Sequence, residues 1–106
     1  MLEPDGAPEN VRGQTISSTS ILVMWDEVPA DQRNGIITGY TIIYHSEKGY
    51  DNGIVDVNGS VRHKILANLK EYVNYKIEVF ASTAIGDGPP SDPIFVTTDQ
   101  DSKLFV

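Results

Sequence analysis

Short stretches of alternating apolar and polar residues recur along the chain, separated by clusters of proline, glycine, asparagine and aspartate. A period of two is typical of β-strands with one buried face, and no long stretch keeps the 3.6-residue period of a helix. The pattern predicts seven strands, at residues 10–16, 20–26, 38–46, 53–57, 62–67, 73–83 and 93–98. Seven strands in about 90 residues predict an all-β fold of two antiparallel sheets packed as a sandwich.

Asparagine–glycine pairs mark the predicted turns. Asn34-Gly35, Asn52-Gly53 and Asn58-Gly59 are expected to supply the left-handed backbone of tight turns. The polar segment 27–35 joins two strongly apolar strands and is expected to be a surface loop.

The inward rows of the strands predict the core. Alternation places Ile21, Val23 and Trp25 on one face of the second strand. Trp25 suits either a buried core or an exposed platform for a ligand, and the core is favoured because Trp25 continues the inward row. Similar rows on the third and sixth strands are Tyr40, Ile42 and Tyr44, and Tyr75, Ile77, Val79 and Ala81.

Several short motifs, taken in order, resemble a fibronectin type III domain. They are Pro8, Val11, the run 20–25, Pro29 and the run 37–44, then Leu69 six residues before Tyr75, Ala81, Gly86, the run 88–91 and Thr98. The resemblance implies a seven-stranded immunoglobulin-like β-sandwich. It also implies that Tyr75 is a tyrosine corner, with a buried ring and a hydroxyl bonded to backbone near 69–72. Trp25, Tyr40, Leu69 and Tyr75 are therefore expected to be structural core residues.

Composition and charge exclude several classes of function. The chain has no cysteine, which excludes thiol chemistry. Its formal net charge of -7 disfavours binding to nucleic acid and to anionic lipid surfaces. The only histidines, His45 and His63, lack the spacing of a zinc site. We expect no catalytic residue, no cofactor and no metal, and no insertion of this segment into a membrane.

One glycosylation sequon is present, at Asn58-Gly59-Ser60. Asn58 lies in a predicted turn from which a glycan would project freely, although the same residues also suit an unmodified turn. Glycosylation would mean that the parent protein is extracellular.

Some apolar residues fall on the outward side of the strands. Leu22 and Met24 alternate with the inward row, and Ile65 on a neighbouring strand is expected beside them. On the other sheet, Ile43, Phe80 and Phe95 are out of phase with the core on three adjacent strands. These three side chains are the predicted interface, with cover by Lys76 and Glu78 as the alternative.

The sequence predicts residues 1–6 as a linker, 7–99 as the fibronectin type III domain and 100–106 as a linker or tail. The sequences of segments 34–40 and 88–94 resemble those of fibronectin type III repeats in neuronal adhesion molecules and receptor phosphatases. This likeness implies a non-catalytic protein-binding or adhesion module, extracellular and monomeric in isolation, with partners among other proteins and neighbouring domains. A passive spacer and an intracellular filament-associated repeat, which would be cytoplasmic, are the alternatives.

Overall fold

The protein folds as a β-sandwich of seven strands in this computed structural model, which describes residues 2–100. The elements, in chain order, are β1 (Glu9–Ser17), β2 (Ser20–Asp26), a short 3-10 helix (Ala30–Gln32), β3 (Gly39–Ser46), β4 (Asn52–Asn58), β5 (His63–Leu66), β6 (Asn74–Ser82) and β7 (Ile94–Thr97). All seven strands overlap those that the alternation predicts. The tail 101–106 lies outside the described residues.

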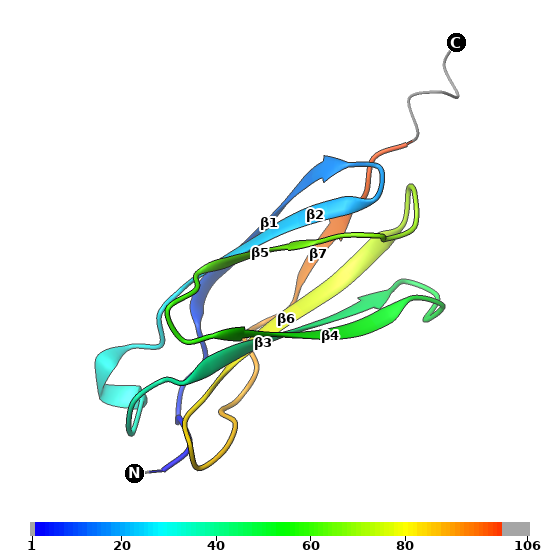
Figure 1. The fold of residues 1–106 in the computed structure, drawn as a ribbon. Coiled ribbons are helices and arrows are strands. Elements are labelled where there is room, and N and C mark those ends of the chain that lie inside the picture. Colours follow the sequence, from blue (N-terminus) through cyan, green and yellow to red (C-terminus); the bar gives the residue numbers. More distant parts are fainter. Residues whose placement is uncertain (1, 101–106) are drawn as a thin grey trace.

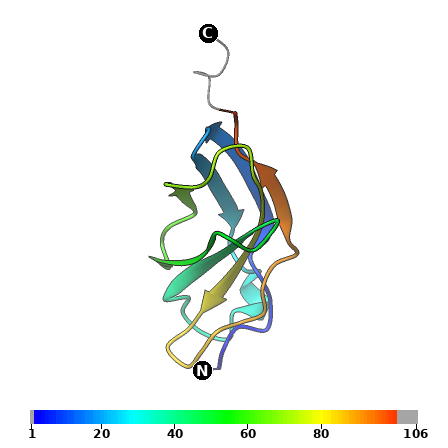
Figure 2. The same cartoon turned by 90° about the vertical axis from the view of Figure 1, so that its right-hand side faces the viewer.

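The strands form two antiparallel sheets that face each other (Figure 1). One sheet has three strands in the order β1-β2-β5, and the other has four in the order β4-β3-β6-β7. A view turned by 90° shows that the described part of the chain begins at one pole of the sandwich and ends at the opposite pole (Figure 2).

The core lies between the sheets and contains the predicted inward rows. Trp25 and Tyr40 are each 1% exposed, and their ring centroids lie 5.5 Å apart. The rest of the buried hydrophobic core comprises Ile21, Val23, Val28, Ile42, Leu66, Leu69, Tyr75, Ile77, Val79 and Ala81. Side chains of alternating strand positions meet here because a strand turns every second residue to the same face.

Tyr75 joins the core to two separate segments, at Lys70 and at Asp51. Its ring is fully buried, its hydroxyl accepts a hydrogen bond from the backbone N–H of Lys70 (2.8 Å), and it donates to Oδ2 of Asp51 (2.6 Å). Burial raises the pKa of Tyr75 to about 12, and the hydrogen bond to Asp51 adds to the shift. The backbone bond at Lys70 is the contact that a tyrosine corner makes.

Of the three predicted asparagine–glycine turns, Asn52-Gly53 is absent, and Asn58-Gly59 begins a turn, closed by Val61 N–H to the carbonyl of Asn58 (3.1 Å), that lacks the expected left-handed backbone. Asn34 does have positive φ (56°), but Asn52-Gly53 lies inside β4, and the turn before it uses Gly49 (φ 76°). The ring of Tyr44 lies across Gly53, so a larger residue does not fit here, because its Cβ would clash with that ring. Gly59 likewise lies under the carbonyl of Ile37, without positive φ.

The segment expected to be a linker packs against the domain over residues 2–6. Leu2 N–H donates to the carbonyl of Asn34 (3.1 Å), Asp5 N–H donates to that of Gln32 (2.8 Å), and Pro4 is buried. The hydroxyl of Thr83 also donates to the carbonyl of Leu2 (2.8 Å). Alternation carries no signal for these contacts, because most of them join backbone to backbone.

Candidate functional site: the outer faces of the two sheets

The four-stranded sheet carries an apolar cluster on its outer face. Ile43 on β3 lies directly opposite Ile54 on β4 and opposite Glu78 on β6, and Phe80 follows two residues after Glu78. Phe80 is thus a diagonal neighbour of Ile43, within reach of a large side chain. We call Ile43, Ile54 and Phe80 the outer patch. Ile54 is 69% exposed, whereas Ile43 and Phe80 are half-buried.

Phe95, which the sequence grouped with Ile43 and Phe80, lies apart from them. It is 64% exposed and stands opposite Lys76, four residues along β6 from Phe80. Four residues of strand span roughly 13 Å. Lys76 and Glu78, whose charged atoms are 3.9 Å apart, occupy the space between the two phenylalanines. The structure therefore brings together two of the three predicted residues.

Ile54 takes the place of Phe95 in the outer patch, and sequence reasoning missed it. Its signal was present, since Val55 and Val57 form an inward row and leave Ile54 on the outward side. Below the patch, Thr41 is buried between its cross-strand neighbours Asp56 and Phe80, and its hydroxyl donates to Oδ1 of Asp56 (2.7 Å). This bond anchors one polar border of the patch.

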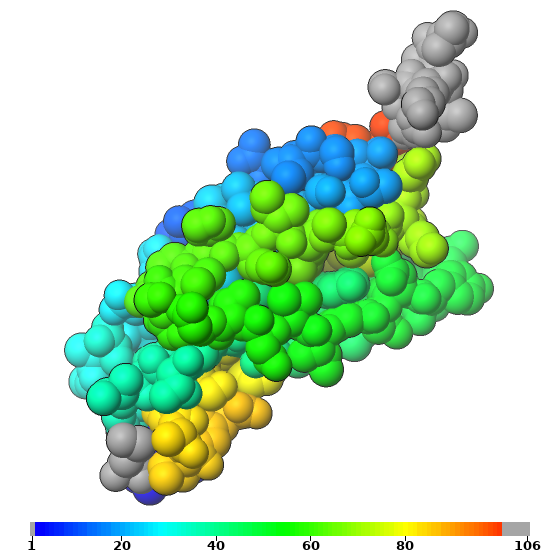
Figure 3. Space-filling model, viewed as in Figure 1, coloured from blue at the N-terminus to red at the C-terminus, as the bar shows by residue number. Residues whose placement is uncertain are grey.

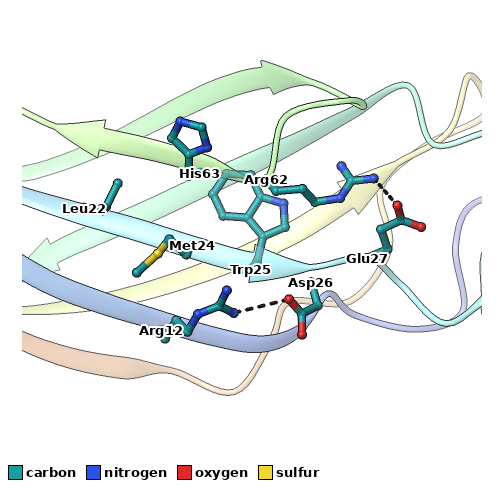
Figure 4. Close-up of a pocket in the computed structure, with 8 residues that line it drawn as sticks. All are labelled: Arg12, Leu22, Met24, Trp25, Asp26, Glu27, Arg62 and His63. Carbon is teal, nitrogen blue, oxygen red and sulfur yellow. Dashed lines mark hydrogen bonds and ion pairs between the residues drawn. The ribbon is translucent and has the colours of Figure 1, made fainter.

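The three-stranded sheet has a second, more charged outer face. Leu22 lies opposite Ile65, and Met24 lies opposite His63, so Leu22, Met24 and Ile65 share the outward face that the alternation predicts. Figure 4 shows the shallow hollow beside Leu22 and Met24, where Arg12 reaches Asp26 on the neighbouring strand (3.3 Å). Apolar side chains on this face are thus bordered by ion pairs.

A triad of charges closes one end of this hollow. Glu27 accepts from both Arg33 and Arg62, each at 2.6 Å. The hydrogen bond and charge of Arg62, with the charge of Arg33, hold the pKa of Glu27 below its usual value. Arg62 also stacks over the ring of Tyr40, 5.2 Å from its centroid. Both carboxylate oxygens are engaged, so we assign Glu27 a structural part in the loop.

Asn58, the predicted glycosylation site, lies exposed at the end of β4. Its Oδ1 accepts from both the backbone N–H (3.0 Å) and the hydroxyl (2.6 Å) of Ser60. Nδ2, the atom that carries an N-linked glycan, has no hydrogen-bond partner among the described residues. The Ser60 bonds thus orient the exposed Asn58 side chain through Oδ1 and leave Nδ2 without a bond to the described residues.

The two histidines, the candidate acid–base or metal-binding residues, lie on different sheets. His45 is on β3 and contacts Oδ1 of Asn52 (3.2 Å), whereas His63 is on β5 in the other sheet. Within residues 2–100, no three His, Cys, Asp or Glu side chains are grouped so that they could hold a metal ion. Over the same residues, no helix has the length and apolar character needed to span a bilayer.

Comparison with known proteins identifies the family. The family model described as fibronectin type III domain matches residues 6–97. Protein sidekick-1 of Gallus gallus is 40% identical over 101 residues, and receptor-type tyrosine-protein phosphatase F of Homo sapiens is 38% identical over 101 residues. Each of these matches covers 92% of this chain but 5% of the relative, so the chain spans a small part of their length.

Solved structures show the same fold. The solution structure of the fn3 domain of human contactin 1 superposes with a TM-score of 0.83 at 33% identity, over 96% of this chain and 84% of that one. The crystal structure of chicken CNTN1 FN1-FN3 domains superposes with a TM-score of 0.82 at 30% identity, over 94% of this chain and 34% of that one. Two-sheet architecture, tyrosine corner and sequence similarity agree: the chain belongs to the fibronectin type III domain family.

Proposed function

We propose that this domain is a non-catalytic protein-binding module from the extracellular region of an adhesion protein or receptor. The observation that carries the proposal is the outer patch, in which Ile54 is 69% exposed beside Ile43 and Phe80. Clustered apolar side chains on a solvent face are typical of surfaces that bind other proteins. Similarity to a receptor-type phosphatase supports a place in a receptor.

The outer patch is the better docking surface of the two sheets. Its apolar side chains lie on three adjacent strands, and at its border the hydroxyl of Thr41 is paired with one carboxylate oxygen of Asp56. On the other face, the ion pairs of Arg12 and Arg62 stand beside the apolar residues. A partner there would have to desolvate charges, which costs free energy that apolar contact must first offset.

A binding screen with matched variants tests this surface. A tetramerised domain is probed against displayed extracellular proteins, as wild type, as Ile54→Ser with Phe80→Ser, and as Leu22→Ser with Ile65→Ser. We expect the first pair to reduce binding of a captured partner by at least about tenfold, because buried apolar contacts are lost. The second pair changes an equal number of apolar side chains on the other sheet and should bind normally.

Thermal melts of both variant pairs are the control for the screen, and two outcomes would contradict the proposal. Both variant pairs should keep the fold, since substitutions at exposed strand positions usually cost about 0.5 kcal/mol each and half-buried ones somewhat more. Loss of binding only in the Leu22 and Ile65 variant would move the docking surface to the three-stranded sheet. A domain that captures no extracellular protein would favour the passive spacer.

Secretion from a eukaryotic cell should add a glycan at Asn58. The expectation follows from the exposed side chain and from the Ser60 hydroxyl bonded to its Oδ1. Intact-mass measurement of the secreted domain should show added hexose-containing mass that disappears in Asn58→Gln. A secreted wild-type domain with only the mass of its unmodified polypeptide would count against the extracellular placement.

A further inference from the structure

Three of the four edge strands carry features that block further strand pairing, and β4 does not. β1 has register shifts on either side of its central pairs and a positive φ at Asn10 (52°). β5 and β7 have only four residues each, with Lys64 in the first and Pro93 directly before the second. Irregular backbone, shortness, lysine and proline all discourage pairing between molecules.

β4 is long and regular by comparison. It has seven residues, pairs with β3 without a register shift, and contains no proline, lysine or arginine. Its single charged side chain, Asp56, is bonded back to Thr41 of its own sheet. In the space-filling view, the green atoms of β4 form the lower right border of the molecule (Figure 3).

The backbone groups that face this edge can be identified from the ladder. Ser46 N–H donates to the carbonyl of Asp51 (2.9 Å), and Gly59 N–H donates to that of Thr38 (3.0 Å). Antiparallel pairs alternate between bonded and non-bonded, so every second residue from 51 to 59 bonds to β3. The residues between them turn their N–H and carbonyl groups outward.

Three residues are left with outward backbone groups along this strand: Asn52, Ile54 and Asp56. Asn58 ends the series, because its carbonyl accepts from the N–H of Val61 (3.1 Å). The three are evenly spaced and centred on Ile54. A two-fold axis at Ile54 therefore brings the outward backbone groups of one copy opposite those of a second copy.

We propose that the partner of this edge is a second copy of the same domain, paired antiparallel through β4 about an axis at Ile54. Ile54 then lies opposite Ile54 of the other copy, and Asn52 lies opposite Asp56. Each of the three pairs exchanges two backbone hydrogen bonds, and an asparagine amide meets a carboxylate oxygen that Thr41 does not use. The two four-stranded sheets become one continuous sheet.

Charge and size make this pairing weak for one domain. Each copy carries a formal net charge of -7, so two copies repel one another, and one strand pair buries less area than a stable dimer needs. An isolated domain at micromolar concentration is therefore a monomer. Copies held together on a surface reach effective concentrations near millimolar, at which the contact forms.

Sedimentation equilibrium at millimolar protein concentration tests the pairing. We expect a monomer–dimer equilibrium whose association constant rises at least about threefold from about 50 mM to about 500 mM NaCl, because salt screens the repulsion. Asp56→Pro should remove the dimer, since proline deletes an outward N–H and leaves the bonds to β3 intact. Asp56→Ala, the matched control, loses the carboxylate but keeps the N–H and should still pair.

Ile54→Lys gives a second way to block the edge if Asp56→Pro does not fold. Asp56→Pro also separates the pairing from the docking surface, because it leaves the side chains of Ile43, Ile54 and Phe80 in place, whereas Ile54→Lys changes the outer patch and tests the pairing alone. Loss of self-association with partner binding retained supports the edge. A domain that stays monomeric at millimolar concentration in high salt overturns the proposal.

A single introduced cysteine reports the register, because the native chain has none. Ile54→Cys should form a covalent dimer under mild oxidation at least about tenfold faster than Phe95→Cys, since Cα atoms of opposite strand residues are about 5.5 Å apart, within disulfide range. Phe95 is similarly exposed but lies on β7, the other edge of the same sheet. Equal rates for the two variants would contradict pairing through β4.

Discussion

Replacing Trp25 with alanine should lower the free energy of unfolding by about 3 to 5 kcal/mol, the cost of deleting a large buried aromatic side chain. Trp25 is 1% exposed and packs against Tyr40 at the centre of the sandwich. A domain of this size has a total stability of only about 5 to 15 kcal/mol. Chemical denaturation followed by circular dichroism measures the loss, because the variant has no tryptophan fluorescence.

Two controls show whether the effect comes from core packing. Nε1 of Trp25 has no hydrogen-bond partner among the described residues, so Trp25→Phe removes volume without orphaning an acceptor and should cost clearly less. Met24→Ala changes the adjacent, outward side chain and should cost less than about 1 kcal/mol. Similar losses for Met24→Ala and Trp25→Ala would show that the indole is not the centre of the core.

Stability should fall between about pH 10 and about pH 12 because of Tyr75, whose pKa is raised to about 12 in the fold. An unfolded tyrosine titrates near pH 10, so the folded state binds the phenolic proton more tightly. This contribution is fully present below pH 10 and is lost as the pH rises through the folded pKa. A difference of about two pKa units corresponds to about 3 kcal/mol.

Tyr75→Phe separates this titration from that of other groups. Burial also raises the pKa values of Tyr40 and Tyr44, and both remain in the variant. The variant should start about 1 to 3 kcal/mol less stable, because Lys70 N–H loses its acceptor, but should decline less between pH 10 and pH 12. Denaturation curves taken across this range give both slopes. Parallel declines would contradict the assignment to Tyr75.

Alternation in the sequence was enough to predict the strands and the buried rows. Trp25, Tyr40 and Tyr75 lie in runs where large apolar residues occupy every second position, and all three are buried. The period of two decides which face a side chain occupies once one position is known to be inward. The same alternation put Ile65 on the outward face with Leu22, and the structure places the two residues opposite each other.

The position of residues along neighbouring strands could not be predicted in the same way. Phe95 and Phe80 share a face, but the pairing of Lys76 with Phe95 separates them. That pairing follows an irregular stretch in which Ser91 N–H bonds to the carbonyl of Val79 (2.8 Å) and its hydroxyl accepts from the N–H of Val79 (3.0 Å). Such side chain to backbone contacts set the length of a connection without leaving a periodic signal.

Detachment of the docked segment 2–6 would let the chain extend under mechanical tension without unfolding the domain. It is held at the amino-terminal pole by a few hydrogen bonds, to Gln32, Asn34 and Thr83. At the opposite pole, the Thr98 hydroxyl donates to the carbonyl of Lys70 (2.7 Å) and accepts from the N–H of Val73 (3.0 Å). Because few bonds hold this segment, we expect a pull on the two poles of Figure 1 to detach residues 2–6 before it strains the pairing of β1 with β2. Five released residues lengthen the chain by at most about 17 Å, at about 3.4 Å each, while the core stays folded.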